Sequence, residues 1–333
     1  MTIENKPKSA ISLVILAMLL SGGTTAVNQQ TDPRSIVFPF QYIGDIDKAH
    51  LNKQNYNPSG ICFHKKRNTL FVVFDLGVVC EMKTDGTIVH EKLIMRADFE
   101  GITHDPSTGL LYVAVERTDQ IIELAPETFT VLRKFSIPRT FMGNTLLKAG
   151  GQGIEAITFV PDIHHPHRGT FYIANQSYDL EDAEDISAVF EVEVPLKNNG
   201  DTNADVKILR YFPLGIIDLS GLYFDMVTDH LYVISDSTNT IFEFTRTGTL
   251  LSGFAFPGDN QEGITVDDQG FLYVAQDSGG VLKIKWKNKQ LRKRENLLLG
   301  PLERRRSRPP RDRGWAEAAG GIEGELSQKG GSP

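Results

Sequence analysis

The sequence is poor in several features that would point to a particular class of protein. Only two cysteines and two tryptophans occur among its 333 residues, so no framework of disulfides holds this chain together. Apolar residues at helical spacing are nearly absent, which argues against a helical bundle. The chain has no Gly-x-Ser-x-Gly elbow, no Ser/His/Asp set fixed by spacing and no phosphate-cradling glycine loop. The sequence therefore gives no support for nucleophilic hydrolysis or nucleotide binding.

A long apolar run occurs near the start of the chain. Lys6 and Lys8 precede apolar residues from Ala10 to Leu20, and small residues follow as far as Ala26. This order is typical of an export signal, although the run is only a little shorter than a membrane-spanning helix. We assign residues 1–30 to a signal peptide or an uncleaved membrane anchor. The expected location is periplasmic or otherwise extracytoplasmic, with membrane association through the N-terminus if the segment is retained.

One phrase occurs twice, and weaker copies of it complete a series of five. Glu100-Gly101-Ile102-Thr103 and Glu262-Gly263-Ile264-Thr265 each precede a Leu-Tyr-Val-like strand. The small anchor residues of the five units lie at positions 60, 101, 156, 221 and 263. Two of the steps are close to 40 residues, and polar insertions explain the two longer ones. A period near 40 residues is that of a propeller blade.

We therefore predict an all-β fold for residues 31–286, a five-bladed β-propeller of four-stranded antiparallel blades. The fifth unit ends near Trp286 without an outer strand, while an unpaired strand lies before the first unit, at Ser35–Ile43. The N-terminal strand is expected to complete the last blade and so close the ring. An open β-sandwich is the alternative. Cys62 and Cys80 fall on strands one and three of one blade, roughly 10 Å apart, which is beyond disulfide reach.

The C-terminal tail, residues 287–333, has no core-forming pattern and is expected to be disordered. From Lys283 onward the chain holds 14 Lys and Arg against 6 Asp and Glu, which leaves 21 basic and 36 acidic residues before it. A basic tail can contact nucleic acid or anionic lipid. An exported chain seldom meets nucleic acid, so no nucleic-acid partner is expected, and a solvated extension is the simpler interpretation.

The repeat places acidic residues at one end of the predicted channel. Strand one is innermost in a propeller blade, and it begins on the face where strand two ends. The residues before the five small anchors are Ser59, Glu100, Glu155, Ser220 and Glu262. Converging carboxylates either take up protons or bind a cation, and oxygen ligands without His or Cys suit Ca²⁺. The alternative is that each Glu caps its own strand.

Further candidate ligands lie where strand two ends, at Asn175, Asp236 and Asp277, although such residues also form local turns. The His164–His167 loop resembles a transition-metal cluster, but it falls on the opposite face. The strand-three glutamates are interpreted as a cross-strand surface position. They are Glu81, Glu123, Glu191 and Glu243.

Whole blades, such as residues 99–116 and 261–275, resemble the SdiA-regulated (YjiK-like) family. The resemblance covers roughly residues 36–286. It implies a five-bladed propeller, distantly similar to NHL-repeat proteins, with a calcium site and an N-terminal membrane segment or signal. Carried over residue by residue, it implies Ca²⁺ ligation by Glu100, Glu155 and Glu262, while Ser59 and Ser220 depart from the Glu pattern. The family supplies no reaction or substrate.

Two functions remain open from the sequence. The first is a non-enzymatic envelope module, expected to be monomeric, whose calcium-bearing face binds a small ligand or an envelope protein. The second is a calcium-dependent hydrolase of the lactonase, esterase or phytase type, in which the ion polarises an ester or phosphoryl oxygen. The proposed channel positions supply almost no basic residues to hold phosphates, which favours binding over catalysis.

Overall fold

The computed structural model describes residues 40–50, 56–181, 186–197, 206–256, 258 and 260–286. These residues belong to one compact unit that begins at residue 40. Every regular element in these ranges is a β-strand, and no helix there is long and apolar enough to cross a membrane. The predicted export segment and the basic tail lie outside the described residues.

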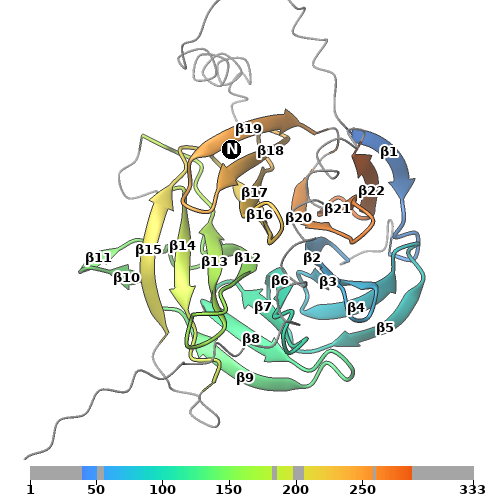
Figure 1. Ribbon diagram of the computed structural model, residues 1–333, viewed down its shortest axis with the longest axis horizontal. Coiled ribbons are helices and arrows are strands. Elements are labelled where there is room, and N and C mark those ends of the chain that lie inside the picture. The colour runs from blue at the N-terminus through green and yellow to red at the C-terminus, as the bar shows by residue number, and fades with distance from the viewer. Residues whose placement is uncertain are drawn as a thin grey trace, which may run out of the picture. The chain divides into compact units, whose positions relative to one another are not determined.

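The described residues form a five-bladed β-propeller, as the repeat predicts (Figure 1). Each blade is a four-stranded antiparallel sheet. The first blade consists of β2 (Pro58–His64), β3 (Thr69–Phe74), β4 (Val78–Lys83) and β5 (Ile88–Leu93). The second consists of β6 (Phe99–His104), β7 (Leu111–Val115), β8 (Gln120–Leu124) and β9 (Val131–Ser136).

The remaining blades keep the same order from the inside outward. The third consists of β12 (Ile154–Pro161), β13 (Gly169–Asn175), β14 (Ala188–Glu193) and β15 (Lys207–Pro213). The fourth consists of β16 (Leu219–Asp225), β17 (His230–Ser235), β18 (Thr240–Thr245) and β19 (Leu250–Ala255). A short hairpin between the second and third blades is made by β10 (Thr140–Phe141) and β11 (Asn144–Thr145).

The fifth blade joins the two ends of the described chain. It consists of β20 (Gln261–Val266), β21 (Phe271–Gln276), β22 (Val281–Trp286) and β1 (Phe40–Asp45). β1 pairs antiparallel with β22, with Phe40 opposite Trp286 and Asp45 opposite Leu282. Figure 1 shows this N-terminal strand as the outer strand of the last blade. The predicted ring closure is confirmed, and it supplies the edge of β22 with a partner.

Apolar side chains fill the spaces between neighbouring blades. The two inner strands of the first blade are buried at every position, whereas its outer strand β5 is exposed or partly exposed throughout. Ile102 of the second blade packs in one cluster with Val73 and Cys62 of the first. Cys62 and Cys80 are both buried and form no disulfide, in agreement with the spacing argument.

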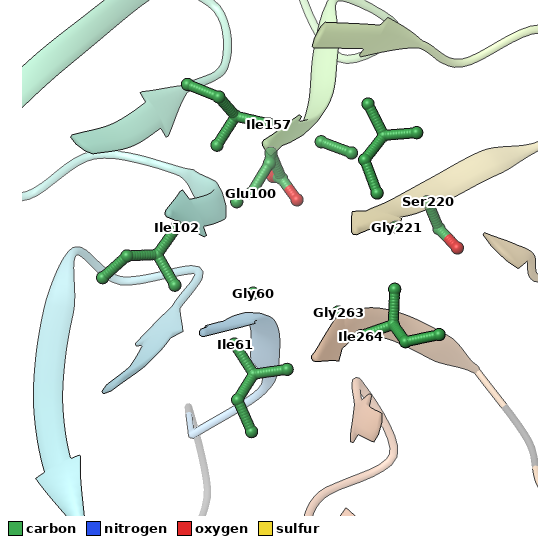
Figure 2. A pocket seen from close by; sticks show the side chains of 12 residues that line it. Gly60, Ile61, Glu100, Ile102, Ile157, Ser220, Gly221, Gly263 and Ile264 are labelled. Atoms are coloured by element: carbon green, nitrogen blue, oxygen red, sulfur yellow. The ribbon is translucent and has the colours of Figure 1, made fainter. Parts of the chain in front are cut away.

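The glycine of the repeated phrase lies where adjacent inner strands come close together. A Cβ on Gly60 would lie 2.7 Å from the Cα of Gly101, and one on Gly101 would lie 2.8 Å from the backbone nitrogen of Ile157. Each glycine thus faces the next blade around the ring. The isoleucine that follows points to the other side of its strand. Figure 2 shows Ile61, Ile102, Ile157 and Ile264 directed outward from the ring of inner strands.

In three of the five blades, the second, third and fifth, the threonine of the phrase joins its blade to the next one. The Thr103 hydroxyl accepts a hydrogen bond of 3.0 Å from the backbone N–H of Phe159 in the next blade. The Thr158 hydroxyl likewise accepts a hydrogen bond of 3.0 Å from the backbone N–H of Phe224. The Thr265 hydroxyl accepts one of 2.9 Å from the backbone N–H of Phe63. These bonds satisfy N–H groups that are buried between inner strands. Glycine, isoleucine and threonine therefore have interblade packing roles, which leaves the glutamate as the candidate for chemistry.

Replacement of Thr158 by valine is expected to lower the free energy of unfolding by about 1–3 kcal/mol, because the buried N–H of Phe224 loses its acceptor. Thr249→Val is a matched control, since Thr249 is exposed on the surface. Urea unfolding of the two variants beside the unmodified protein measures the difference. Equal stabilities of the two variants would show that the interblade bond contributes nothing.

Candidate functional site at the channel mouth

The candidate glutamates lie at irregularities in the inner strands. Pairing between the first two strands of a blade shifts register at the residue that precedes each small anchor, for example between Phe99 and Gly101 and between Ile154 and Ala156. The residue that is passed over is Glu100 in the second blade and Glu155 in the third. A β-bulge redirects a side chain that would otherwise follow the strict alternation of the strand. In Figure 2 the Glu100 carboxylate turns into the space between the inner strands.

Four carboxyl groups from two neighbouring blades meet at the channel mouth. Carboxylate oxygens of Asp98, Glu100 and Glu116 all lie within 4.8 Å of one another. Glu155, from the third blade, shares a hydrogen bond with Glu116. We call these four residues the mouth cluster. Arg117, which is largely exposed, donates a hydrogen bond of 3.0 Å to Asp98.

Burial and mutual repulsion favour the neutral forms of these carboxyl groups. Burial, followed by the charges of Glu155 and Asp98, raises the pKa of Glu100 well above its usual range. The pKa of Glu155 is also raised far above that of an exposed glutamate, first by burial and then by Glu116. Burial raises the pKa of Glu116 as well. Two carboxyl groups that share a hydrogen bond hold one proton between them unless a cation replaces it.

A second group of acids lies on the other side of the mouth. Burial raises the pKa of Glu262 well above its usual range, and the negative charges of Asp236 and Glu100 raise it further. Burial also raises the pKa of Asp277. Asp236 accepts a hydrogen bond of 2.8 Å from the backbone N–H of Gln261. Charge coupling between Glu100 and Glu262 indicates that the predicted glutamates form one electrostatic unit around the channel.

The first blade contributes one further acid, Asp75, to the same unit. The hydroxyl of Ser59, which stands where other blades carry Glu, donates a hydrogen bond to Asp75. Burial raises the pKa of Asp75 to about 6, and the charges of Asp277 and Asp98 add to this effect while the Ser59 bond opposes it. In the fourth blade Ser220 donates to the backbone carbonyl of Gln261 at 2.7 Å. The two serines thus serve as local hydrogen-bond donors at the mouth.

Two oxygen atoms at the mouth fit the role of cation ligands. Oε1 of Glu155 is buried and has no hydrogen-bond partner among the described residues, and the same holds for Oδ1 of Asp277. Glu155 as a whole is only 7% exposed. A buried carboxylate oxygen without a donor is costly unless it is protonated or binds a cation. The oxygen-only donor set of the mouth cluster suits a hard ion such as Ca²⁺.

Asn175 is used differently from the other predicted residues. It is fully buried. Its amide nitrogen donates to the backbone carbonyl of Ile186, and its amide oxygen accepts a hydrogen bond of 3.0 Å from the backbone N–H of Ala188. Both amide atoms therefore bind within the third blade, so the side chain fixes the start of β14.

Asp98 was not among the residues that the repeat singled out, although the repeat contains a signal for it. Asp98 lies two residues before Glu100, immediately before the inner strand. Equivalent positions in the fourth and fifth blades hold Asp218 and Asn260, and the first blade holds Asn57. Asp218 is buried and accepts hydrogen bonds from Gln176 at 2.8 Å and from the Ser237 backbone at 2.9 Å. The position three residues before the small anchor is therefore a further repeated position that adds carboxylates and amides to the mouth.

The other sequence candidates have structural partners. His165 lies 3.0 Å from Glu193 in the loop between β12 and β13. Each strand-three glutamate accepts hydrogen bonds from residues of its own blade. Glu123 binds Arg133 and Tyr112, and Glu243 binds Ser252 and Tyr232. The cross-strand interpretation agrees with these bonds. The surface interpretation does not hold for Glu81 and Glu123, which are buried.

A five-bladed propeller with a buried acidic channel mouth is the class of protein that this geometry defines. The model of the SdiA-regulated family matches residues 34–279. The chain belongs to this family. No curated protein matches the sequence significantly.

Solved structures of low sequence identity are similar to this chain. Glutaminyl cyclase from Myxococcus xanthus is 11% identical, with a TM-score of 0.52 over 74% of this chain and 95% of that chain. A streptogramin B lyase is 11% identical, with a TM-score of 0.42 over 74% of this chain and 97% of that chain. Virginiamycin B lyase from Staphylococcus aureus is 15% identical, with a TM-score of 0.39 over 74% and 73% of the two chains. At 11% identity the likeness to the glutaminyl cyclase concerns the fold alone.

Proposed function

We propose that this protein is an exported envelope propeller that binds Ca²⁺ at the channel mouth and uses this face to bind a small ligand or an envelope protein. The observation that carries the calcium proposal is the unpartnered, buried Oε1 of Glu155 beside three other carboxyl groups. Export is supported by Lys6, Lys8 and the apolar residues 10–20. We propose a periplasmic or extracytoplasmic location, with or without an N-terminal anchor, and a monomeric state.

The proposed ligands of the ion are the mouth cluster, with Glu262 and Asp277 as candidates on the opposite side. Asp236 is a further candidate. Ca²⁺ accepts six to eight oxygens at flexible angles, which suits carboxylates that come from separate blades. The bound ion would neutralise charges that otherwise require protonation. It would also offer remaining coordination positions to an anionic or carbonyl-bearing ligand at the mouth.

Calcium titration calorimetry on the full chain, after removal of metal by chelation, tests this proposal. Binding is expected with a dissociation constant on the order of 10⁻⁴–10⁻³ M or tighter, the range of extracellular calcium modules. Glu155→Gln removes a charged ligand and is expected to weaken binding at least about 10-fold. Glu127→Gln is the matched control because this glutamate is 67% exposed and pairs only with Arg67 among the described residues. Absence of binding by the unmodified protein at millimolar Ca²⁺ would refute the proposal.

A second function, a calcium-dependent hydrolase, is favoured by one observation. Burial raises the pKa of Glu116 and Glu155, and a carboxylate of raised pKa that the proposed ion leaves uncoordinated can accept a proton from metal-bound water. Screens with lactones, carboxylic esters and phosphate esters in the presence of Ca²⁺ distinguish the two functions. Saturable turnover that is lost in Glu116→Gln would establish catalysis. Calcium binding without turnover would leave the ligand-binding function.

A further inference from the structure

A second group of metal-ligating side chains lies away from the mouth, where the chain passes from the outer strand of the fifth blade to the first blade. His50 of this connection, Cys80 of β4 and Glu91 of β5 each offer one ligand atom, and these atoms all lie within 4.8 Å of one another. His50 is 1% exposed and Cys80 is fully buried. Cys80 and Glu91 face each other across the β4–β5 ladder. We call His50, Cys80 and Glu91 the connection site.

Partners behind these side chains orient them as in known metal centres. Nδ1 of His50 lies 2.9 and 3.0 Å from the two carboxylate oxygens of Asp47, which is fully buried. A carboxylate at Nδ1 places the proton there and leaves Nε2 as the metal ligand. Nε2 points at Oε2 of Glu91, 2.5 Å away, while the Tyr56 hydroxyl donates a hydrogen bond of 2.8 Å to Oε1. Tyr56 thus holds Oε1 of Glu91 in place, and Oε2 of Glu91 faces the imidazole.

Packing fixes the imidazole ring in this orientation. The ring stacks on Tyr56 with centroids 4.7 Å apart and an interplanar angle of 7°. It also makes an edge contact with Phe74, with ring centroids 5.0 Å apart. The three ligand types come from three separate segments of the chain. One thiolate, one imidazole and one carboxylate form a set that favours Zn²⁺, which takes four ligands in a tetrahedron. A fourth position remains for water or another small donor.

We propose that the connection site binds a zinc-class divalent ion through Cys80 Sγ, His50 Nε2 and Glu91 Oε2. Binding displaces the thiol proton of Cys80 and any proton on Nε2 of His50 to the buffer, and the Nε2–Glu91 contact opens to admit the ion. The ion ties the connection that follows β1 to the two outer strands of the first blade. Without the ion, the same groups form a hydrogen-bonded Asp–His–Glu chain. Asp47 and Tyr56 are positioning residues.

The test titrates Zn²⁺ into the reduced, metal-free full chain against a chromophoric chelator, with Ca²⁺ in excess so that the mouth cluster is occupied. One zinc ion per chain is expected. Co²⁺ in place of Zn²⁺ is expected to give the absorption of a thiolate-to-cobalt charge-transfer band, which carboxylates at the mouth and the histidines of the 164–167 loop cannot produce. Both signals are expected to vanish in Cys80→Ser. Cys62→Ser is the matched control because Cys62 is buried in the same blade outside the connection site.

Two milder variants keep the proposal testable if Cys80→Ser does not fold. Glu91 is 26% exposed, so Glu91→Gln leaves the fold largely intact and is expected to weaken zinc binding. Asp47→Asn is expected to weaken it about 10–100-fold, the usual effect of removing the partner of a histidine ligand. No zinc binding by the unmodified chain, or equal binding and an equal cobalt band in Cys80→Ser, would overturn the proposal and identify the cluster as a proton-bridged structural contact.

Discussion

Calcium-free protein is expected to lose thermal stability as the pH rises from about 5 to 9, and Glu155→Gln is expected to remove much of this loss. The unfolded chain titrates its glutamates near pH 4.3. In the folded protein, burial and neighbouring carboxyl groups raise the pKa values of Glu100, Glu155 and Glu262 well above that value. The folded state therefore holds more protons than the unfolded state between these values. Stability is fully present below the unfolded pKa and declines as pH rises through the folded pKa values.

Calcium is expected to stabilise the unmodified protein more than the Glu155→Gln variant. At a concentration 100-fold above its dissociation constant, a ligand that binds only the folded state stabilises it by about 2.7 kcal/mol. For a domain of this size, this corresponds to a rise in melting temperature of roughly 5–10 °C. Glu155→Gln is expected to be the more stable protein without Ca²⁺ at pH 8 and the less stabilised one with it. Melting curves with chelator and with Ca²⁺ at pH 5, 7 and 9 measure both effects.

The Glu127→Gln variant again serves as the control for these melts, because Glu127 is exposed and remote from the mouth cluster. Its curves are expected to follow those of the unmodified protein at each pH. If the calcium-free protein were instead most stable at pH 9, the mouth carboxylates would have to be ionised and stabilised by neighbouring groups. That outcome would contradict the electrostatic description of the mouth.

Replacement of Gly221 by alanine is expected to lower the free energy of unfolding by about 3 kcal/mol, at the upper end of the usual cost of overpacking. A Cβ at this position would collide with the backbone carbonyl oxygen of Glu262 in the next blade. Backbone cannot rotate away as a flexible side chain can, so the two inner strands must separate. For a domain of this size the melting temperature is expected to fall by roughly 6–12 °C.

Gly151→Ala is a suitable control for the glycine substitution. A Cβ on Gly151 would meet its nearest neighbours, the Glu116 carboxylate oxygens, at an ordinary distance of 3.8 Å. Urea unfolding measures the free energy of unfolding of both variants, and so compares alanine at a crowded position with alanine at an uncrowded one. Since β20 carries Glu262, separation of the strands in Gly221→Ala is also expected to weaken calcium binding. Equal stabilities of the two variants would mean that the close approach of the inner strands can relax without cost.

The sequence predicted the fold well because the positions of the repeated phrase obey packing and hydrogen-bonding constraints that recur in several blades. Gly101 and Gly263 mark the close approach of inner strands, and Thr103 and Thr265 mark the bonds between blades. The missing outer strand of the fifth unit predicted ring closure, because an antiparallel sheet with an open edge needs a partner.

The candidate site could be predicted only in part. The repeat identified Glu100, Glu155 and Glu262, whose strand entrances converge by symmetry. Asp98 was not identified, although Asp or Asn recurs at the equivalent position of four blades, because this position lies before the inner strand and not within it. The repeat also could not tell that Asn175 turns toward its own blade, since hydrogen bonds to Ile186 and Ala188 decide this. Side-chain direction at strand ends depends on such local bonds and not on the period of the repeat.

The pairing of β1 with β22 has a consequence for the order in which the blades fold during synthesis. β1 is synthesised before any blade, yet its hydrogen-bonding partner is the last strand of the propeller. During synthesis the four earlier blades can form one after another, while β1 cannot pair until β22 has been made. The fifth blade alone needs both ends of the described chain at once. This sheet can therefore be completed only after all five blades have been synthesised, because the strand produced first is the one paired last.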